Sequence, residues 1–143
     1  RFDEVEVRAV GRTSMGVKGI NLGKDDEVIG METVTDKNAY VLAITENGFG
    51  KRTELEEYRQ QARAGKGVLT YKTTSKTGHI IGIKIVNDED DIMIITDTGV
   101  IIRLNVDEIS VLGRNTQGVT LMRTSDGGKV ISIAKVVKED EEE

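Results

Sequence analysis

The hydrophobic residues of this chain lie in short runs that are rich in β-branched side chains and are bounded by Gly, Asn or Asp. Examples are residues 28–31, 68–71, 80–86 and 91–95. Short runs of this composition, separated by turn-forming residues, are typical of β-strands. Glu46-Asn47-Gly48 lies between two of the runs and is a strong hairpin signal, because Asn and Gly accept positive φ. The pattern predicts an all-β chain made of antiparallel hairpins.

The pattern repeats along the chain with a fixed period. Three arginines each begin a six-residue segment ending in Gly-Val, and consecutive segments lie 51 residues apart: Arg12, Arg63 and Arg114. A second set of arginines keeps the same spacing: Arg1, Arg52 and Arg103. A period of this length indicates one supersecondary unit used repeatedly. Four strand-like runs occupy each unit, so we expect a four-stranded antiparallel blade every 51 residues.

Two short segments carry helix-start signals. Thr53 and Glu56 form a capping-box pattern, and the counterpart segment in the next repeat begins with the capping residue Asn105. Both segments are too short to form a stable helix alone. We therefore expect a single helical or 3₁₀ turn in each repeat, leading into the segment that begins with Arg63 or Arg114.

Four-stranded units of this length are typical of β-propellers, which close with about 4 to 8 blades. The 143 residues hold fewer than three periods, and Arg1 enters in the middle of one. We expect residues 1–137 to be a partial propeller of two full repeats and two partial ones, in a piece of a longer protein. We expect residues 138–143 to be an acidic, disordered tail.

Composition excludes several kinds of site. There is no cysteine and only one histidine, so disulfides and the usual Cys/His zinc sites are excluded. No apolar run approaches the roughly 18 residues of a membrane helix. The net charge is −5, but residues 138–143 alone carry one positive and five negative charges. The rest is near neutral, so the acidic balance does not exclude a nucleic-acid partner.

No catalytic site is expected in this segment, because its Asp and Glu pairs lie in predicted turns and no phosphate-binding P-loop pattern is present. The best binding candidate is the glycine-rich segment 61–67 with four nearby cations: Gln61, Arg63, Gly65, Lys66, Gly67, Lys51, Arg52, Arg59 and Lys72. Exposed N–H groups and cations suit phosphate oxygens, and only 3% of residues are aromatic, which argues against base stacking. The residues alone leave two interpretations open: contact with the backbone of duplex DNA, or a structural turn whose glycines only allow positive φ.

Three motifs make the chain resemble a known family: Tyr58-Arg-x-Gln-x-Arg-x-Gly-Lys-Gly-Val68, Ile94-Ile-Thr-x-x-Gly-x-x-x-Arg103 and Gly113-Arg-Asn-Thr-Gln-Gly-Val119. The resemblance is to the C-terminal domain of bacterial DNA gyrase A, and it covers essentially the whole chain. It implies a fragment of a β-pinwheel, a relative of the propeller whose blades exchange a strand with their neighbours.

The resemblance also implies a function. The family's domain binds and wraps duplex DNA around a basic rim, which supports ATP-dependent negative supercoiling by the parent type II topoisomerase. The implied partners are double-stranded DNA, the rest of gyrase A, and gyrase B, with no membrane. The implied location is the bacterial cytoplasm, at the nucleoid. ATP and Mg are used elsewhere in the parent enzyme, so no cofactor is expected in this segment.

The family's wrapping motif, the gyrase A box, reads Gln-Arg-Arg-Gly-Gly-Lys-Gly and lies in the first blade. Residues 61–67 resemble a degenerate copy in a later blade, with one cation lost, so we expect the intact box upstream of Arg1. Carried over, the resemblance makes Arg63 and Lys66 phosphate contacts, with Gly65 and Gly67 shaping the loop. Neighbouring corners would extend a curved track through three further cations: Arg12, Lys18 and Arg114.

Two alternatives to this function remain. The related C-terminal domain of topoisomerase IV contacts DNA without wrapping it for negative supercoiling. A propeller scaffold of another class would use the Gly-Arg corners only structurally and would bind proteins. The acidic tail has two interpretations of its own, competition with DNA for the basic rim or simple solubilisation.

Overall fold

The computed structural model describes residues 1–125 and 127–136, and the tail expected at 138–143 lies outside the described residues. The described chain contains seven strands: β1 (Tyr40–Thr45), β2 (Phe49–Glu54), β3 (Ile80–Val86), β4 (Asp91–Thr96), β5 (Ile101–Asn105), β6 (Val119–Thr120) and β7 (Val130–Val136). It also contains three 3₁₀ turns: η1 (Glu4–Glu6), η2 (Leu55–Glu57) and η3 (Val106–Glu108). The turns η2 and η3 confirm the short helical segments expected at these places.

The strands form two sheets in which every pairing is antiparallel. One sheet has the order β3-β1-β2-β6 and the other has the order β5-β4-β7. The hairpins β1–β2 and β4–β5 close at Gly48 and Gly99, whose φ angles of 83° and 84° lie in the left-handed region that glycine tolerates. The antiparallel, nearly all-β architecture expected from the sequence is confirmed.

Each sheet takes strands from the following repeat. β3 and β7 pair with the first strand of the preceding hairpin, β1 and β4 respectively. β6 lies one repeat later than the segment 68–71 that follows β2, and it pairs with the outer side of β2. The β1–β2 hairpin therefore has both edges covered by segments that come later in the chain, as the pinwheel resemblance implies. Among the described residues the second sheet has three strands instead of the four expected, and its hairpin is covered only at β4.

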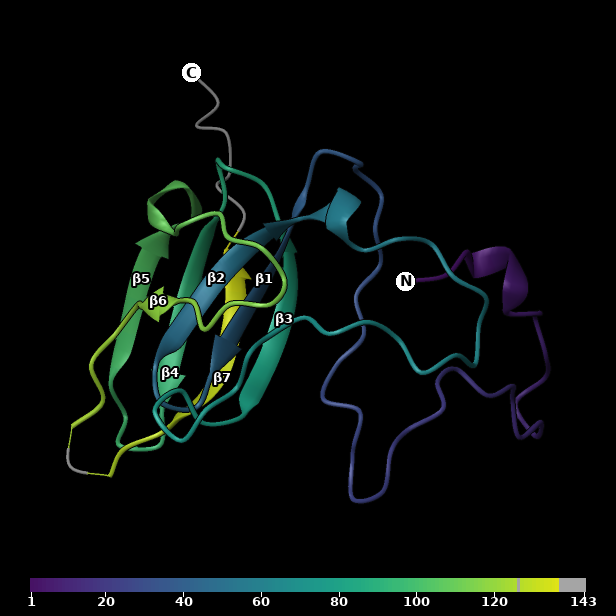
Figure 1. Cartoon of the computed structure of the whole chain (residues 1–143), viewed down its shortest axis with the longest axis horizontal. Coiled ribbons are helices and arrows are strands. Elements are labelled where there is room, and N and C mark those ends of the chain that lie inside the picture. Colours follow the sequence, from purple (N-terminus) through teal and green to yellow (C-terminus); the bar gives the residue numbers. More distant parts are fainter. Residues whose placement is uncertain (126, 137–143) are drawn as a thin grey trace.

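Three of the expected strands are absent, one of them the segment after Gly16-Val17. Residues 28–31 and 68–71 have the composition of strands and occupy the places of β3 and β6 in the earlier repeat, but neither forms a strand. Neither segment pairs with a hairpin among the described residues. Backbone N–H and C=O groups need partners to form a ladder. Residues 1–38 therefore run as irregular chain, apart from η1 and turns, on one side of the sheets (Figure 1).

One hydrophobic core joins the two sheets. Leu42 and Ile44 from β1 lie in the same cluster as Ile92 and Ile94 from β4, and all four side chains are fully buried. Figure 1 shows the two sheets packed against each other, with the irregular N-terminal segment beside them. The core fixes the hairpins, and the hairpins in turn set the positions of the loops described below.

Arg52 on β2 links its own repeat to the next one. Its Nε donates to the Ile109 carbonyl at 2.7 Å, and an Nη donates to the Asp107 carbonyl at 3.3 Å. The other Nη pairs with the Asp88 carboxylate, and the guanidinium lies 4.7 Å from the ring centroid of Tyr40. The residue is only 6% exposed. Arg52 therefore fastens the η3 turn to the preceding blade.

Arg1 makes the equivalent contact one repeat earlier. Its guanidinium donates to the carbonyls of Leu55 and Tyr58, both at 3.3 Å, and Tyr58 is the repeat equivalent of Ile109. Arg103, the third member of the set, instead pairs with the Asp91 carboxylate at 2.6 Å. For Arg1 and Arg52, the spacing thus reflects a structural link between repeats.

Replacing Arg52 by Met should destabilise the fold. The substitution leaves the buried Ile109 carbonyl without its donor and removes the bond to the Asp107 carbonyl, at a cost of about 2 to 4 kcal/mol. Urea unfolding followed by circular dichroism measures the change. Arg59→Met is the control, because Arg59 is exposed and surface substitutions of this kind usually change stability by less than about 0.5 kcal/mol. Equal stability of the two variants would contradict the structural role.

Candidate functional site

The three arginine-glycine segments form loops at equivalent places, here called the first (residues 10–16), second (61–67) and third (112–118) corner loops. Each ends in a glycine with left-handed φ: Gly16 at 79°, Gly67 at 82° and Gly118 at 70°. A Cβ atom at Gly118 would clash with the Tyr71 hydroxyl and the Gly50 carbonyl. At Gly67 the nearest atom is a methyl of Ile20 at 3.9 Å, so only φ requires glycine there.

The third corner loop is fastened to β2 at both ends. The Leu112 N–H donates to the Arg52 carbonyl at 2.8 Å at its start, and Val119, immediately after it, pairs with Gly50. Lys51 lies between these two anchor points. The loop is therefore closed over a single residue of β2, although the loop and the strand are some 60 residues apart in the sequence.

Lys51 fills the interior of the third corner loop. Its Nζ donates to the carbonyls of Gly113 at 2.7 Å and Arg114 at 2.6 Å, and to the Thr116 hydroxyl at 3.0 Å. The ammonium also lies 4.8 Å from the ring centroid of Tyr71. The residue is 1% exposed. Burial lowers the pKa of Lys51 to about 8, while the nearby carboxylate of Glu57 opposes the shift by raising it.

The burial of Lys51 and Arg52 argues against the expectation that both contact DNA. Each is buried, and each uses its donors on main-chain carbonyls of the following repeat. A polyanion outside the protein cannot reach these groups without unfolding the loop or the turn they hold. We therefore assign both residues to the framework that shapes the corner loops.

Arg63 in the second corner loop also points back into the protein. Its backbone N–H donates to Oε2 of Glu6 at 2.7 Å, and its Nε donates to the Glu6 carbonyl at 3.1 Å. An Nη donates to the Lys18 carbonyl. Several donors of Arg63 are thus bonded within the protein. We therefore assign this residue first to stabilising the loop, and only second to contacting phosphate.

Arg114 repeats this arrangement in the third corner loop. Its backbone N–H donates to Oε2 of Glu57 at 3.0 Å, and an Nη donates to the Leu69 carbonyl at 2.8 Å. Glu57 and Leu69 are the repeat equivalents of Glu6 and Lys18. The two loops therefore share one construction, in which a carboxylate holds the arginine amide and the guanidinium is turned inward.

Lys66 differs from these cations because its side chain is exposed at the outer end of the second corner loop. It borders a hollow of about 180 Å³ together with Asn21 and Asp26. The equivalent positions in the other two loops hold Met15 and Gln117. Only the second corner loop therefore carries a cation at this position.

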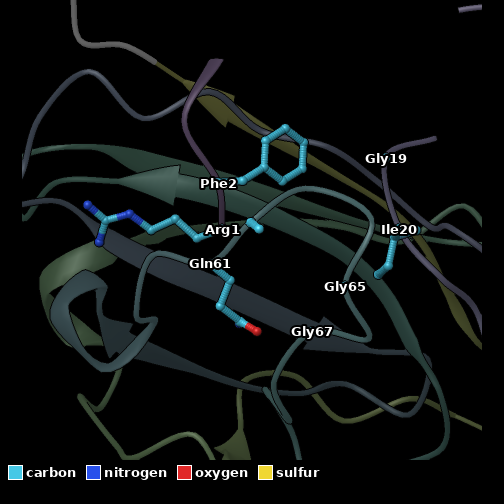
Figure 2. A pocket seen from close by; sticks show the side chains of 8 residues that line it. Arg1, Phe2, Gly19, Ile20, Gln61, Gly65 and Gly67 are labelled. Atoms are coloured by element: carbon cyan, nitrogen blue, oxygen red, sulfur yellow. The ribbon is translucent and has the colours of Figure 1, made fainter. Parts of the chain in front are cut away.

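The remaining predicted residues lie around the second corner loop. Gln61 donates its N–H to the Arg1 carbonyl at 2.9 Å and lines a hollow of about 80 Å³ with Gly65 and Gly67, as Figure 2 shows. Lys18 is exposed and its ammonium donates to Oδ1 of Asn21 at 3.0 Å. Arg12, in the first corner loop, is exposed.

Lys72, one of the cations that the sequence places near residues 61–67, is exposed. Its N–H donates to the Thr116 carbonyl at 3.0 Å, which brings it beside the third corner loop. The Asn21 N–H makes the equivalent bond to the Gly65 carbonyl at 2.9 Å. Each of these two corner loops is thus crossed by the segment that follows the previous one. The 51-residue spacing of Asn21 and Lys72 could have suggested this position, but not the contact.

Other kinds of site find little support in the described part of the chain. Among residues 1–125 and 127–136, no group of three or more His, Cys, Asp or Glu side chains could hold a metal ion. The same residues include no helix long and apolar enough to cross a membrane.

Comparison with known proteins gives a consistent family. The family described as "DNA gyrase C-terminal domain, beta-propeller" matches residues 1–35, 39–87 and 90–136. The DNA gyrase A protein of Staphylococcus epidermidis (strain ATCC 12228) is 47% identical over 142 residues, covering 99% of this chain and 16% of the relative. The DNA gyrase A protein of Escherichia coli (strain K12) is 44% identical over 143 residues, covering 100% of this chain and 16% of the relative. The chain thus spans about one sixth of the length of these relatives.

Solved structures agree with this match. A DNA gyrase A C-terminal domain superposes with a TM-score of 0.89 at 26% identity, covering 95% of this chain and 46% of that one. The C-terminal domain of a DNA topoisomerase IV superposes with a TM-score of 0.88 at 31% identity, covering 94% and 42%. The pinwheel expectation is therefore confirmed at the level of the fold.

The buried ammonium of Lys51 should make stability depend on pH. The unfolded chain holds this proton up to about pH 10.5, whereas the folded chain releases it near pH 8. Because the unfolded state binds more protons between these values, the free energy of unfolding should rise with pH there. Lys51→Met lacks this titrating group. The unfolding free energy of the wild type minus that of the variant should therefore increase with pH. A difference that stays constant across this range would argue against the shifted pKa.

Proposed function

Because the chain belongs to the DNA gyrase C-terminal domain, beta-propeller family, we propose that it binds double-stranded DNA through its corner loops as part of a type II topoisomerase. Its partners are then the remainder of gyrase A, and gyrase B, in the bacterial cytoplasm at the nucleoid. No reaction step takes place in this segment, and the ATP and Mg of the parent enzyme act elsewhere. Its contribution is to hold and wrap DNA during negative supercoiling.

The shared construction of the second and third corner loops is the observation that carries this proposal. Both loops turn an arginine inward and are crossed by another segment of the chain, so their outer ends are presented in the same way from one repeat to the next. A duplex has a regular backbone, and contact with its phosphates needs cations and N–H groups but no base readout. Loops of one construction, repeated along the chain, suit the regular backbone of a duplex.

The exposed cations suit this role better than the buried ones. Lys66 lies at the outer end of the second corner loop, and Lys18 and Lys72 lie on segments that cross the loops. Arg12 adds an exposed cation in the first corner loop. We retain Arg63 and Arg114 as secondary phosphate contacts, because part of each guanidinium is already bonded within the protein.

A second candidate is the topoisomerase IV type of contact, in which DNA is bound but not wrapped. The superposition with a topoisomerase IV C-terminal domain at 31% identity supports it. Binding to a relaxed circle, followed by removal of unconstrained supercoils with a nicking-closing enzyme, separates the two. Wrapping leaves a changed linking number, and contact without wrapping leaves it unchanged.

Duplex affinity should depend steeply on salt and on Lys66. With about four phosphate contacts, the affinity should fall about 150-fold between 50 and 200 mM salt. Lys66→Ala should weaken binding to any sequence about equally and reduce the log–log salt slope by about 0.9. Electrophoretic shifts with linear duplexes of two sequences measure both quantities. Lys37→Ala is the matched control, because Lys37 is exposed in a turn outside the corner loops. A flat salt titration of the wild type would count against DNA binding and favour a protein-binding scaffold.

Adding a cation to the third corner loop should strengthen binding. Gln117 is the repeat equivalent of Lys66 and is exposed, so Gln117→Lys should supply one more phosphate contact and raise duplex affinity about 3- to 8-fold near 100 mM salt. Thr33→Lys adds the same charge at an exposed position outside the loops. If the two variants bind equally well, the effect is one of net charge, and the proposed equivalence of the corner loops is wrong.

A further inference from the structure

Two glutamates make the same contact in two successive repeats. Oε2 of Glu6 accepts the N–H of Arg63 at 2.7 Å, and Oε2 of Glu57 accepts the N–H of Arg114 at 3.0 Å. Each acceptor lies in a 3₁₀ turn, 57 residues before the amide it holds. The contact therefore belongs to the repeat itself and is not an accident of one loop.

A carboxylate bound to the backbone of a loop that meets DNA is unexpected. A negative charge beside a phosphate-binding surface lowers affinity by repulsion, so a neutral residue would serve the electrostatics better. Glu6 is exposed, and burial in the core does not account for its position. The hydrogen bond to the loop amide distinguishes it from Glu4 in the same turn, whose bond within the described residues is made through its backbone carbonyl.

The second corner loop needs such a restraint. Ala64 has a φ of 63°, in the left-handed region that costs a residue with a Cβ atom roughly 1 to 2 kcal/mol. Backbone bonds hold the loop at Gln61 and Ala64, through the carbonyls of Arg1 and Gly19, both at 2.9 Å. Among the described residues, Glu6 is the side chain that holds the amide between these two points.

We propose that Glu6 and Glu57 are positioning residues, whose carboxylates fix the first turn of the second and third corner loops so that the outer ends of the loops meet the DNA backbone. This inference rests on the proposed function. In the second corner loop the residue presented is Lys66, three positions after the amide that Glu6 holds. Glu6 therefore acts on DNA through the loop and not by touching it.

The sign of the mutational effect tests the proposal. Removing a carboxylate near DNA should by simple electrostatics strengthen binding, whereas loss of a positioning residue should weaken it. Glu6→Ala, which removes the acceptor, should weaken duplex binding about 5-fold in the full 143-residue chain. Glu6→Gln keeps an oxygen acceptor while losing the charge, so it should bind as well as the wild type or better. Glu6→Asp keeps the charge but shortens the reach, so it should weaken binding as Ala does.

Glu4→Ala is the matched control, because it removes the same charge two residues away and should leave affinity equal or slightly higher. In a Lys66→Ala background the effect of Glu6→Ala should shrink to less than about 2-fold, since both changes act through one loop. Amide hydrogen exchange of Arg63, followed by NMR without DNA, should accelerate in Glu6→Ala and Glu6→Asp and stay slow in Glu6→Gln. This readout reports the loop directly.

The outcomes separate the two proposals. If the wild type shows no salt-dependent duplex binding, the proposed function fails, and the exchange rate of the Arg63 amide still tests the contact. If the wild type binds but Glu6→Ala binds as tightly as or more tightly than it does, the positioning role is overturned. Weakening by Glu6→Gln equal to that by Glu6→Ala would also overturn it, because charge and not hydrogen bonding would then be responsible.

Discussion

Pairing of backbone groups between successive repeats is the constraint on which the rest of this structure depends. A hairpin such as β1–β2 has two open edges, and both are covered by segments from later in the chain, β3 on one side and β6 on the other. The third corner loop immediately precedes β6, so its end is fixed wherever β6 pairs with β2. Sheet formation therefore fixes the position of the loop, and the shape of the loop depends on β2 as much as on its own residues.

The same constraint explains why some cations of this chain are buried and others are exposed. A residue of β2 that lies between the anchor points of the loop is covered by it, so the ammonium of Lys51 is enclosed by carbonyls of Gly113 and Arg114. Arg52, next along the strand, meets the η3 turn of the following repeat. Lys66 lies at the outer end of a loop and remains in water. Cations that shape the corner loops are therefore distinct from those available to a phosphate.

Covering an edge also decides which strand-like segments become strands. Residues 80–86 and 28–31 have similar β-branched composition, but only the former meet a hairpin within the chain and form β3. Leu69, in the segment equivalent to β6, is 57% exposed for the same reason. Propensity makes a segment suitable for a sheet, and a partner strand makes it part of one.

The amino-acid sequence by itself determined the period, the hairpins at Gly48 and Gly99, the short turns at η2 and η3, and the family, because these follow from local patterns and their spacing. It also indicated that residues 61–67 are the best candidate for a binding site. Only the tertiary structure decided that Lys51 and Arg52 face inward and that Glu6 and Glu57 hold loop amides. These outcomes depend on contacts between residues more than 50 positions apart. No local pattern records which side of a strand a distant loop will cover.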